Sequence, residues 1–126
     1  MLDIGQEFSA ERTFTAAMVD AFTAISLDHG RHHTTSATDA RIVHGLLVAT
    51  LATEIGGRLD FLARTLDFEF LRPVYVGDTI RCTARIDRME SAEDRTRLWL
   101  SALCVNQRGV EVMRVTARGV VFKPRQ

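Results

Sequence analysis

The sequence predicts an α+β domain in which an antiparallel β-sheet wraps around one long central helix. Two observations lead to this class. Residues 42–59 are apolar around most of a helical circumference, which is typical of a buried helix. The segments that follow alternate apolar and polar residues with the two-residue period of β-strands. The chain of 126 residues shows no internal repeat or linker, so residues 1–126 are expected to form a single domain.

The first half of the chain predicts one strand and two helices. Residues 7–15 alternate apolar and polar side chains well enough to predict a short first strand. Residues 15–26 carry apolar side chains at the spacing of an amphipathic helix. Residues 30–41 are polar and rich in Thr, Ser and Asp, which predicts a loop. The buried helix follows over 42–59, and the pair Gly56–Gly57 is expected to end it.

Four antiparallel strands are predicted after the buried helix. They cover residues 63–74, 79–90, 95–106 and 109–122 and are joined by short polar turns. Arg72 is expected on a solvated strand face. A sheet that curls around a single central helix is the hotdog architecture, and we therefore expect a hotdog fold.

The two cysteines are too few for a disulfide framework. If the hairpin between the third and fourth strands turns at Ala92–Glu93, Cys82 lies opposite Leu103 and not opposite Cys104. This register disfavours a disulfide. Both cysteines are expected to pack as small apolar side chains.

The composition excludes several classes of protein. Lysine and arginine together number 16, as do aspartate and glutamate, so the chain lacks the basic field that draws proteins to nucleic acid. The start of the sequence does not read as a signal peptide, and the longest apolar run is too short to span a bilayer. We therefore expect a cytoplasmic protein with no nucleic-acid partner and no membrane segment.

A cluster of histidines lies between the two predicted helices. His29, His32, His33 and His44 are all the histidines of the chain, and Asp28 precedes them. A structural zinc site needs four well-placed ligands, usually from two separated pairs, and no Cys-x-x-Cys motif supplies a second pair. We therefore expect no metal here.

Three stretches of the sequence carry a family resemblance. The stretch over 21–33 reads AFTAISLDHGRHH, the stretch over 42–57 reads IVHGLLVATLATEIGG, and the stretch over 66–80 reads LDFEFLRPVYVGDTI. Together they resemble the MaoC-like dehydratases, the (R)-specific enoyl-CoA hydratase branch of the hotdog superfamily. The third stretch is shared with thioesterases, and the first two are more specific.

The resemblance implies roles for residues of the histidine cluster. Asp28 falls on the catalytic aspartate of the family and His33 on its catalytic histidine, while Gly45 falls on the glycine whose N–H polarises the thioester carbonyl. The chain departs from the family motif at Gly30 and Arg31, where the family has Asn and Pro. The loop between His33 and Gly45 is also shorter than is common in the family.

Three further residues are expected to contact the substrate. Arg31 is assigned either to a CoA phosphate or to an ion pair with Asp39. His44 precedes the glycine as a helix-start residue that supports the loop, and Leu46 follows that glycine in the first helical turn.

The chemistry of hydration fits these residue types. An Asp–His pair can activate water and move a proton, because histidine titrates near neutral pH. A backbone N–H at a helix N-terminus stabilises the negative charge that develops on the thioester oxygen. The resemblance implies addition of water to a trans-2-enoyl-CoA to give an (R)-3-hydroxyacyl-CoA, with no cofactor beyond the CoA of the acyl-CoA substrate. A homodimer is expected, with a higher oligomer as an alternative, because a lone hotdog sheet leaves exposed edges.

Two other functions stay open. A hotdog acyl-CoA thioesterase would use a carboxylate such as Glu54, the single charge of the buried helix before Gly56–Gly57, to place water at the carbonyl. A non-catalytic acyl-CoA-binding domain would bind the thioester without turnover.

Overall fold

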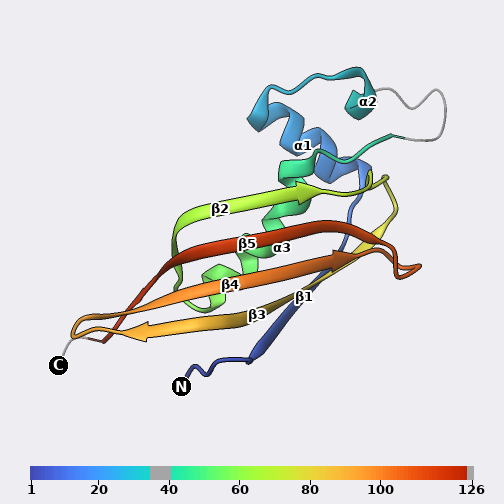
Figure 1. Ribbon diagram of the computed structural model, residues 1–126. Helices are drawn as coiled ribbons and strands as arrows, with labels where there is room; N and C mark the ends of the chain where they lie inside the picture. The colour runs from blue at the N-terminus through green and yellow to red at the C-terminus, as the bar shows by residue number, and fades with distance from the viewer. Residues whose placement is uncertain (35–40, 125–126) are drawn as a thin grey trace.

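The chain folds into a five-stranded antiparallel sheet with one long helix on its inner face, in a computed structural model that describes residues 1–34 and 41–124 (Figure 1). The strands follow the order β1-β3-β4-β5-β2 across the sheet. In chain order the elements are β1 (Glu7–Thr13), α1 (Ala16–Ser26), α2 (Arg31–Thr34), α3 (Gly45–Arg58), β2 (Leu62–Phe70), β3 (Thr79–Ser91), β4 (Arg95–Val105) and β5 (Glu111–Phe122). The predicted hotdog fold is confirmed.

The helix α1 ends in a turn that redirects the chain. Thr15 caps its start by accepting a hydrogen bond from the N–H of Met18 at 3.2 Å. Leu27 closes its end in the left-handed region, with φ 61°, and donates its N–H to the carbonyl of Thr23. The next residues form the single turn α2, so the predicted loop over 30–41 is wrong for residues 31–34. Residues 35–40 lie outside the described part of the chain.

The central helix α3 is shorter at its start than the sequence pattern predicted. Residues 42–44 are not helical, because Ile42 forms a bridge with Tyr75 and the N–H of Val43 donates to the carbonyl of Val74 at 2.7 Å. The helix also runs through both glycines that were expected to end it, and Asp60 takes the positive φ of 54°. At 14 residues α3 is the longest helix, and none in the described residues is long and apolar enough to cross a membrane.

The sheet covers only one face of α3. Val48, Ala49, Leu51 and Ile55 are buried, as the pattern predicted, but Leu46 is 62% exposed. The expectation of a helix buried all round is therefore wrong for a single chain. Its apolar circumference exceeds what one sheet can cover.

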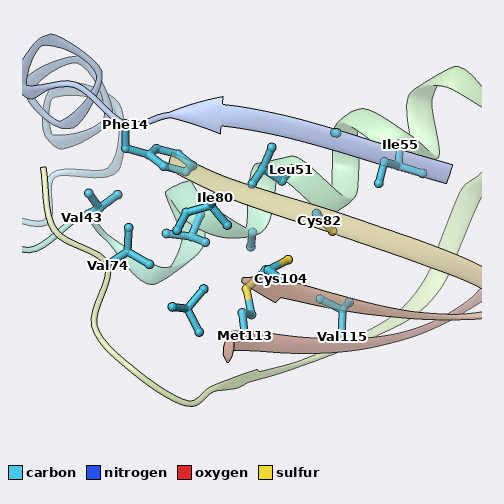
Figure 2. Close-up of a cluster of buried hydrophobic side chains, with 14 of the residues drawn as sticks. Phe14, Val43, Leu51, Ile55, Val74, Ile80, Cys82, Cys104, Met113 and Val115 are labelled. Carbon is cyan, nitrogen blue, oxygen red and sulfur yellow. The ribbon is translucent and has the colours of Figure 1, made fainter. Parts of the chain in front are cut away.

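The core fills the space between α3 and the inner faces of the strands (Figure 2). Leu51 projects from the helix among side chains of the sheet, and Phe14 closes the core between β1 and α1. Full burial of one such side chain contributes about 1.5–3 kcal/mol to folding. The remaining labelled members of this core are Val43, Ile55, Val74, Ile80, Cys82, Cys104, Met113 and Val115.

A β-bulge changes the register between β3 and β4. Ser91 pairs with Thr96, so the hairpin turns at Glu93–Asp94, one residue later than expected, and the register shifts back by one residue between Ile86 and Arg88. Cys82 therefore lies opposite Cys104, and the predicted pairing with Leu103 is wrong. Both cysteines are free and buried, as the expectation of packed thiols implied. The Cys82 sulfur and burial both raise the pKa of the Cys104 thiol, so it stays neutral.

The edge strand β2 is largely uncovered. It pairs with β5 on one side, and its other edge is free of strands in the described chain. Leu66 is 43% exposed and Phe70 53% exposed, although both lie on the apolar face of the strand. The helix does not reach far enough across β2 to bury them.

Candidate active site

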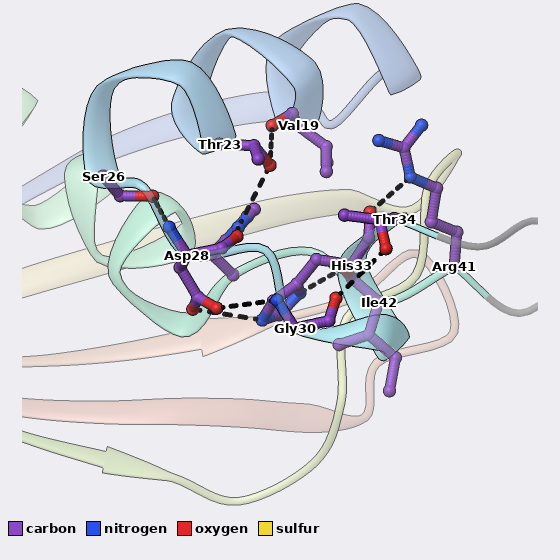
Figure 3. Close-up of polar contacts among 10 residues, drawn as sticks. Val19, Thr23, Ser26, Asp28, Gly30, His33, Thr34, Arg41 and Ile42 are labelled. Carbon is purple, nitrogen blue, oxygen red and sulfur yellow. Dashed lines mark hydrogen bonds and ion pairs between the residues drawn. The ribbon is translucent and has the colours of Figure 1, made fainter.

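Asp28 and His33 meet at one end of the sheet, where α1, α2 and the start of α3 come together (Figures 1 and 3). The Asp28 Oδ2 atom lies 3.5 Å from the His33 Nε2 atom. Asp28 Oδ1 accepts the N–H of Gly30 at 3.1 Å, and this turn starts α2, which carries His33 back over the carboxylate. The structure thus brings together the two residues that the sequence proposed as an acid–base pair.

The hydrogen bonds of His33 determine which ring nitrogen carries the proton in the neutral ring. His33 is 5% exposed, and its Nδ1 lies 2.7 Å from the carbonyl oxygen of Ile42. Because a carbonyl only accepts, Nδ1 is the donor and Nε2 presents a lone pair toward Asp28. The 3.5 Å separation is too long for a direct hydrogen bond, so both groups remain able to accept a proton from a water placed between them.

Asp28 is ionised at neutral pH. The N–H of Gly30 is the main cause that holds the pKa of this carboxyl below its usual range, and the neighbouring His33 acts in the same direction. The side chain is 52% exposed, so its free oxygen faces solvent and an incoming substrate. The carboxylate is therefore available as a proton acceptor.

His44 stacks beneath the His33 ring. Their centroids are 3.8 Å apart at an interplanar angle of 17°. Asp28, His33 and His44 have potential ligand atoms within 4.8 Å of one another. The nitrogen lone pairs of a histidine lie in its ring plane, so two nearly parallel stacked rings do not aim them at a common point. The arrangement does not favour a metal ion.

Gly45 begins α3 beside this pair. No backbone hydrogen bond of the described residues uses its N–H, as expected for the first turn of a helix. The N–H lies at the positive end of a 14-residue helix dipole, where it can stabilise an anionic oxygen. A methyl group on Gly45 would lie 2.8 Å from the Phe70 ring, so glycine is needed for this close packing.

The pair lines a cavity of about 650 Å³. Gly45, His44 and Leu46 line it as well, so five of the six predicted site residues share one cavity. Arg31 is exposed and is not among the lining residues, which leaves its assignment to substrate without support from the structure. Its alternative partner, Asp39, lies outside the described residues.

The sequence pattern missed several residues of this cavity. Arg72 lines it just after β2 ends, although the pattern assigned Arg72 to a solvated strand face. His32 is exposed but also lines the cavity, and its ring centroid lies 4.0 Å from that of His33 in an edge-on arrangement. The position of Arg72 within the family-like stretch over 66–80 was the available signal. The other residues that the pattern missed include Phe22, Phe70 and Met113.

Glu54 lies away from this cavity. It is nine residues after Gly45, about 13 Å along the helix axis. Arg12 and Arg58 each place a guanidinium nitrogen 2.6 Å from its carboxylate. Arg58 and then Arg12 hold the pKa of Glu54 below its usual range. A carboxylate held by two arginines is poorly placed to activate water at a thioester bound near Gly45.

Known proteins resemble this chain over nearly its whole length. The (R)-specific enoyl-CoA hydratase of Aeromonas caviae is 32% identical over 135 residues, which cover 98% of this chain and 96% of that protein. A solved (R)-hydratase structure from A. caviae has a TM-score of 0.78 at 28% identity and covers 98% of both chains. A MaoC-like dehydratase from Rhodospirillum rubrum shares the fold, with a TM-score of 0.81 at 20% identity over 99% of this chain and 96% of that one.

The model of the Thioesterase superfamily matches residues 46–92, which include nearly all of the central helix and the two strands after it, β2 and β3. This match is common to the hotdog superfamily, whereas the full-length relative carries the hydratase description. The chain therefore belongs to the MaoC-like dehydratase and (R)-specific enoyl-CoA hydratase family of the hotdog superfamily and is an enzyme of the hydro-lyase class.

Proposed function

We propose that this protein adds water to a trans-2-enoyl-CoA to form an (R)-3-hydroxyacyl-CoA, and catalyses the reverse dehydration. The observation that carries the proposal is the convergence of Asp28, the Nε2 atom of His33 and the N–H of Gly45 on one cavity. This reaction needs two groups that accept and return a proton and one hydrogen-bond donor that stabilises the negative charge on the thioester oxygen. The relative described as an (R)-specific enoyl-CoA hydratase supports the (R) configuration in this proposal.

The proposed reaction begins with a water held between Asp28 and His33. As the pair takes a proton from the water, the oxygen of the water bonds to C3 of the substrate. The π bond between C2 and C3 breaks at the same time. The electron pair moves toward the thioester oxygen, where the N–H of Gly45 stabilises the charge. The pair then delivers the proton to C2, which restores the thioester and completes the balance of atoms.

We propose that the acyl chain extends from this cavity along α3. Val48 lines the catalytic cavity, and Ala52 and Gly56 follow it at helical spacing on the same face of α3. These last two residues line a second, apolar cavity of about 130 Å³ beneath the sheet. On β5 the lining continues from Met113 to Val115, so the two cavities adjoin the same two elements.

We also propose that the enzyme uses no dissociable cofactor and no metal. Proton transfer by Asp28 and His33 and charge stabilisation by Gly45 supply each step of the reaction. We place the protein in the cytoplasm, in keeping with two buried free thiols. Treatment with a chelator is expected to leave kcat unchanged, and a loss that added metal restores would contradict the metal-free mechanism.

We propose that the working protein is a homodimer formed along β2. This strand has a free edge, and an exposed edge of nine residues invites pairing with another strand. Leu46, Leu66 and Phe70 beside it are each at least 43% exposed, and Leu46 and Phe70 line the catalytic cavity. Size-exclusion chromatography with light scattering is expected to give twice the chain mass of 14.1 kDa, and a monomer at micromolar concentration would contradict this assembly.

One assay separates the candidate functions. Loss of the enoyl absorbance of crotonyl-CoA indicates hydration, and release of free thiol indicates thioester hydrolysis. We expect hydration by the wild-type protein, a fall in kcat of about 10²–10⁴-fold for Asp28→Asn, and little change for Glu54→Gln. Thiol release that depends on Glu54 would favour the thioesterase, and CoA-thioester binding without turnover would favour a non-catalytic domain.

A further inference from the structure

The buried ring of His44 has no role in the proposed chemistry, yet it contacts both catalytic residues. His44 is 2% exposed and occupies the N-cap position of α3. An N-cap side chain ordinarily accepts a hydrogen bond from the first helical turn, but that of His44 makes no such bond. Helix capping therefore does not account for a histidine here.

The contacts of the His44 Nε2 atom fix its tautomer. This atom lies 3.1 Å from the carbonyl oxygen of Asp28 and 3.3 Å from Oγ1 of Thr23. The hydroxyl of Thr23 donates its single proton to the carbonyl of Val19 at 2.9 Å, as Figure 3 shows. Both neighbours of Nε2 are thus acceptors, so Nε2 carries the proton and donates to them.

The other ring nitrogen of His44 is left without a partner. Among the buried side-chain nitrogen and oxygen atoms of the described residues, Nδ1 of His44 is the one without a hydrogen-bond partner. An unpartnered polar atom in a buried position destabilises the fold, and in a native structure it calls for an explanation. The ring also stacks on His33 at 3.8 Å and lies 4.9 Å from the ring of Phe22. These contacts leave His44 little freedom to move.

We propose that His44 is a positioning residue for the Asp28–His33 pair, an inference that rests on the proposed function. The bond from Nε2–H to the Asp28 carbonyl holds the backbone from which the carboxylate projects. The His44 ring stacks on one face of His33 and, with the bond from His33 to Ile42, sets the 3.5 Å separation of the two proton acceptors, which a water can bridge from the side. Thr23 fixes the His44 ring to α1, so α1 and α3 together hold the pair.

Two substitutions separate the hydrogen bond from the stacked ring. His44→Phe keeps a ring and loses the donor, while His44→Gln places an amide N–H near the position of Nε2. We expect His44→Phe to lower kcat about tenfold to hundredfold, with KM within about threefold of wild type, because displacing a catalytic group by about 1 Å costs up to about 10²-fold. His44→Gln is expected to restore kcat to within about threefold of wild type.

His29→Phe is the matched control, since His29 is an exposed histidine in the turn between α1 and α2. It is expected to behave as the wild type. In an Asp28→Asn background His44→Phe should lower kcat by less than about twofold, because a residue that acts through Asp28 has no further effect once the carboxylate is gone. An undiminished effect in that background, a change confined to KM, or a loss in His44→Gln equal to that in His44→Phe would overturn the proposal.

The tautomer gives a readout that needs no enzymatic activity. Long-range ¹H–¹⁵N NMR spectra of the wild-type protein are expected to show the His44 proton on Nε2 and none on Nδ1. A proton on Nδ1 alone would remove the bond to Asp28 and refute the positioning role, even if the variants do not fold. Absence of hydration by a wild-type protein that has the Nε2 tautomer would instead refute the proposed function.

Discussion

Substitution of Gly45 by alanine tests the oxyanion role with a change of one methyl group. The added Cβ would lie 2.8 Å from the Phe70 ring, and ordinary contact begins at 3.4 Å, so the ring has to move by about 0.6 Å. Phe70 is 53% exposed and has room to swing toward solvent. The fold should therefore tolerate the change, and the higher helix propensity of alanine, about 1 kcal/mol, offsets part of the strain.

The catalytic effect of Gly45→Ala is expected to be larger than its effect on stability. The methyl group would lie beside the N–H that we propose donates to the thioester oxygen, and it would displace Phe70, which lines the cavity. We expect kcat/KM for crotonyl-CoA to fall about tenfold to hundredfold, equivalent to about 1.4–2.8 kcal/mol of transition-state stabilisation. The rate is measured from the loss of enoyl absorbance, and the melting temperature is measured alongside it.

Gly57→Ala is the matched control for this experiment. Gly57 lies on the same helix, and a Cβ there would meet no atom within 4 Å. This variant is expected to keep full activity and to melt at or above the wild-type temperature. In a Phe70→Ala background, Gly45→Ala should cost less, because the clashing ring is gone. Equal kcat/KM for Gly45→Ala and Gly57→Ala would refute the placement of the thioester at Gly45.

Three further predictions concern α3. Leu51→Ala is expected to lower the free energy of unfolding by about 2–5 kcal/mol, measured by urea denaturation, because Leu51 is fully buried; a cost below about 1 kcal/mol would contradict its place in the core. Ala52→Met should reduce kcat/KM for octenoyl-CoA while sparing crotonyl-CoA, and equal losses for both would argue against a chain path along α3. Glu54→Gln should melt below the wild type at neutral pH. The folded-state pKa of Glu54 is lowered by Arg58 and Arg12, so the stabilisation is present above the unfolded pKa and is lost as pH falls through the folded pKa. A difference in melting temperature that persists in acid would contradict this assignment.

Local patterns in the sequence were sufficient to predict the architecture. The alternation of Ile80, Cys82, Ala84 and Ile86 identified the inner face of β3, because side-chain direction in a strand depends only on its two-residue period. The spacing of Asp28 and His33 was similarly informative. A turn and one helical turn separate them, so their approach is nearly a local property of the chain.

Features that depend on distant contacts were not predictable in this way. A turn at Glu93–Asp94 instead of Ala92–Glu93, together with the bulge between Ile86 and Arg88, places Cys82 opposite Cys104, and no local motif marks the bulge. The glycines within α3 did not end the helix, because packing against the sheet stabilises the turns on either side of them. Local propensity is a weak force beside such packing.

The sequence by itself determined the class of the fold, the helix that fills it and the identity of the three groups proposed for catalysis. The fold class and the helix depend on periodicity and composition, whereas the three groups come from the family resemblance of short stretches of the sequence. The tertiary structure decided that His44 touches both Asp28 and His33, that Phe70 lies on Gly45, and that Glu54 is held by arginines away from the cavity. These contacts join residues distant in the chain, and their geometry exists only once the helices and the sheet have packed together.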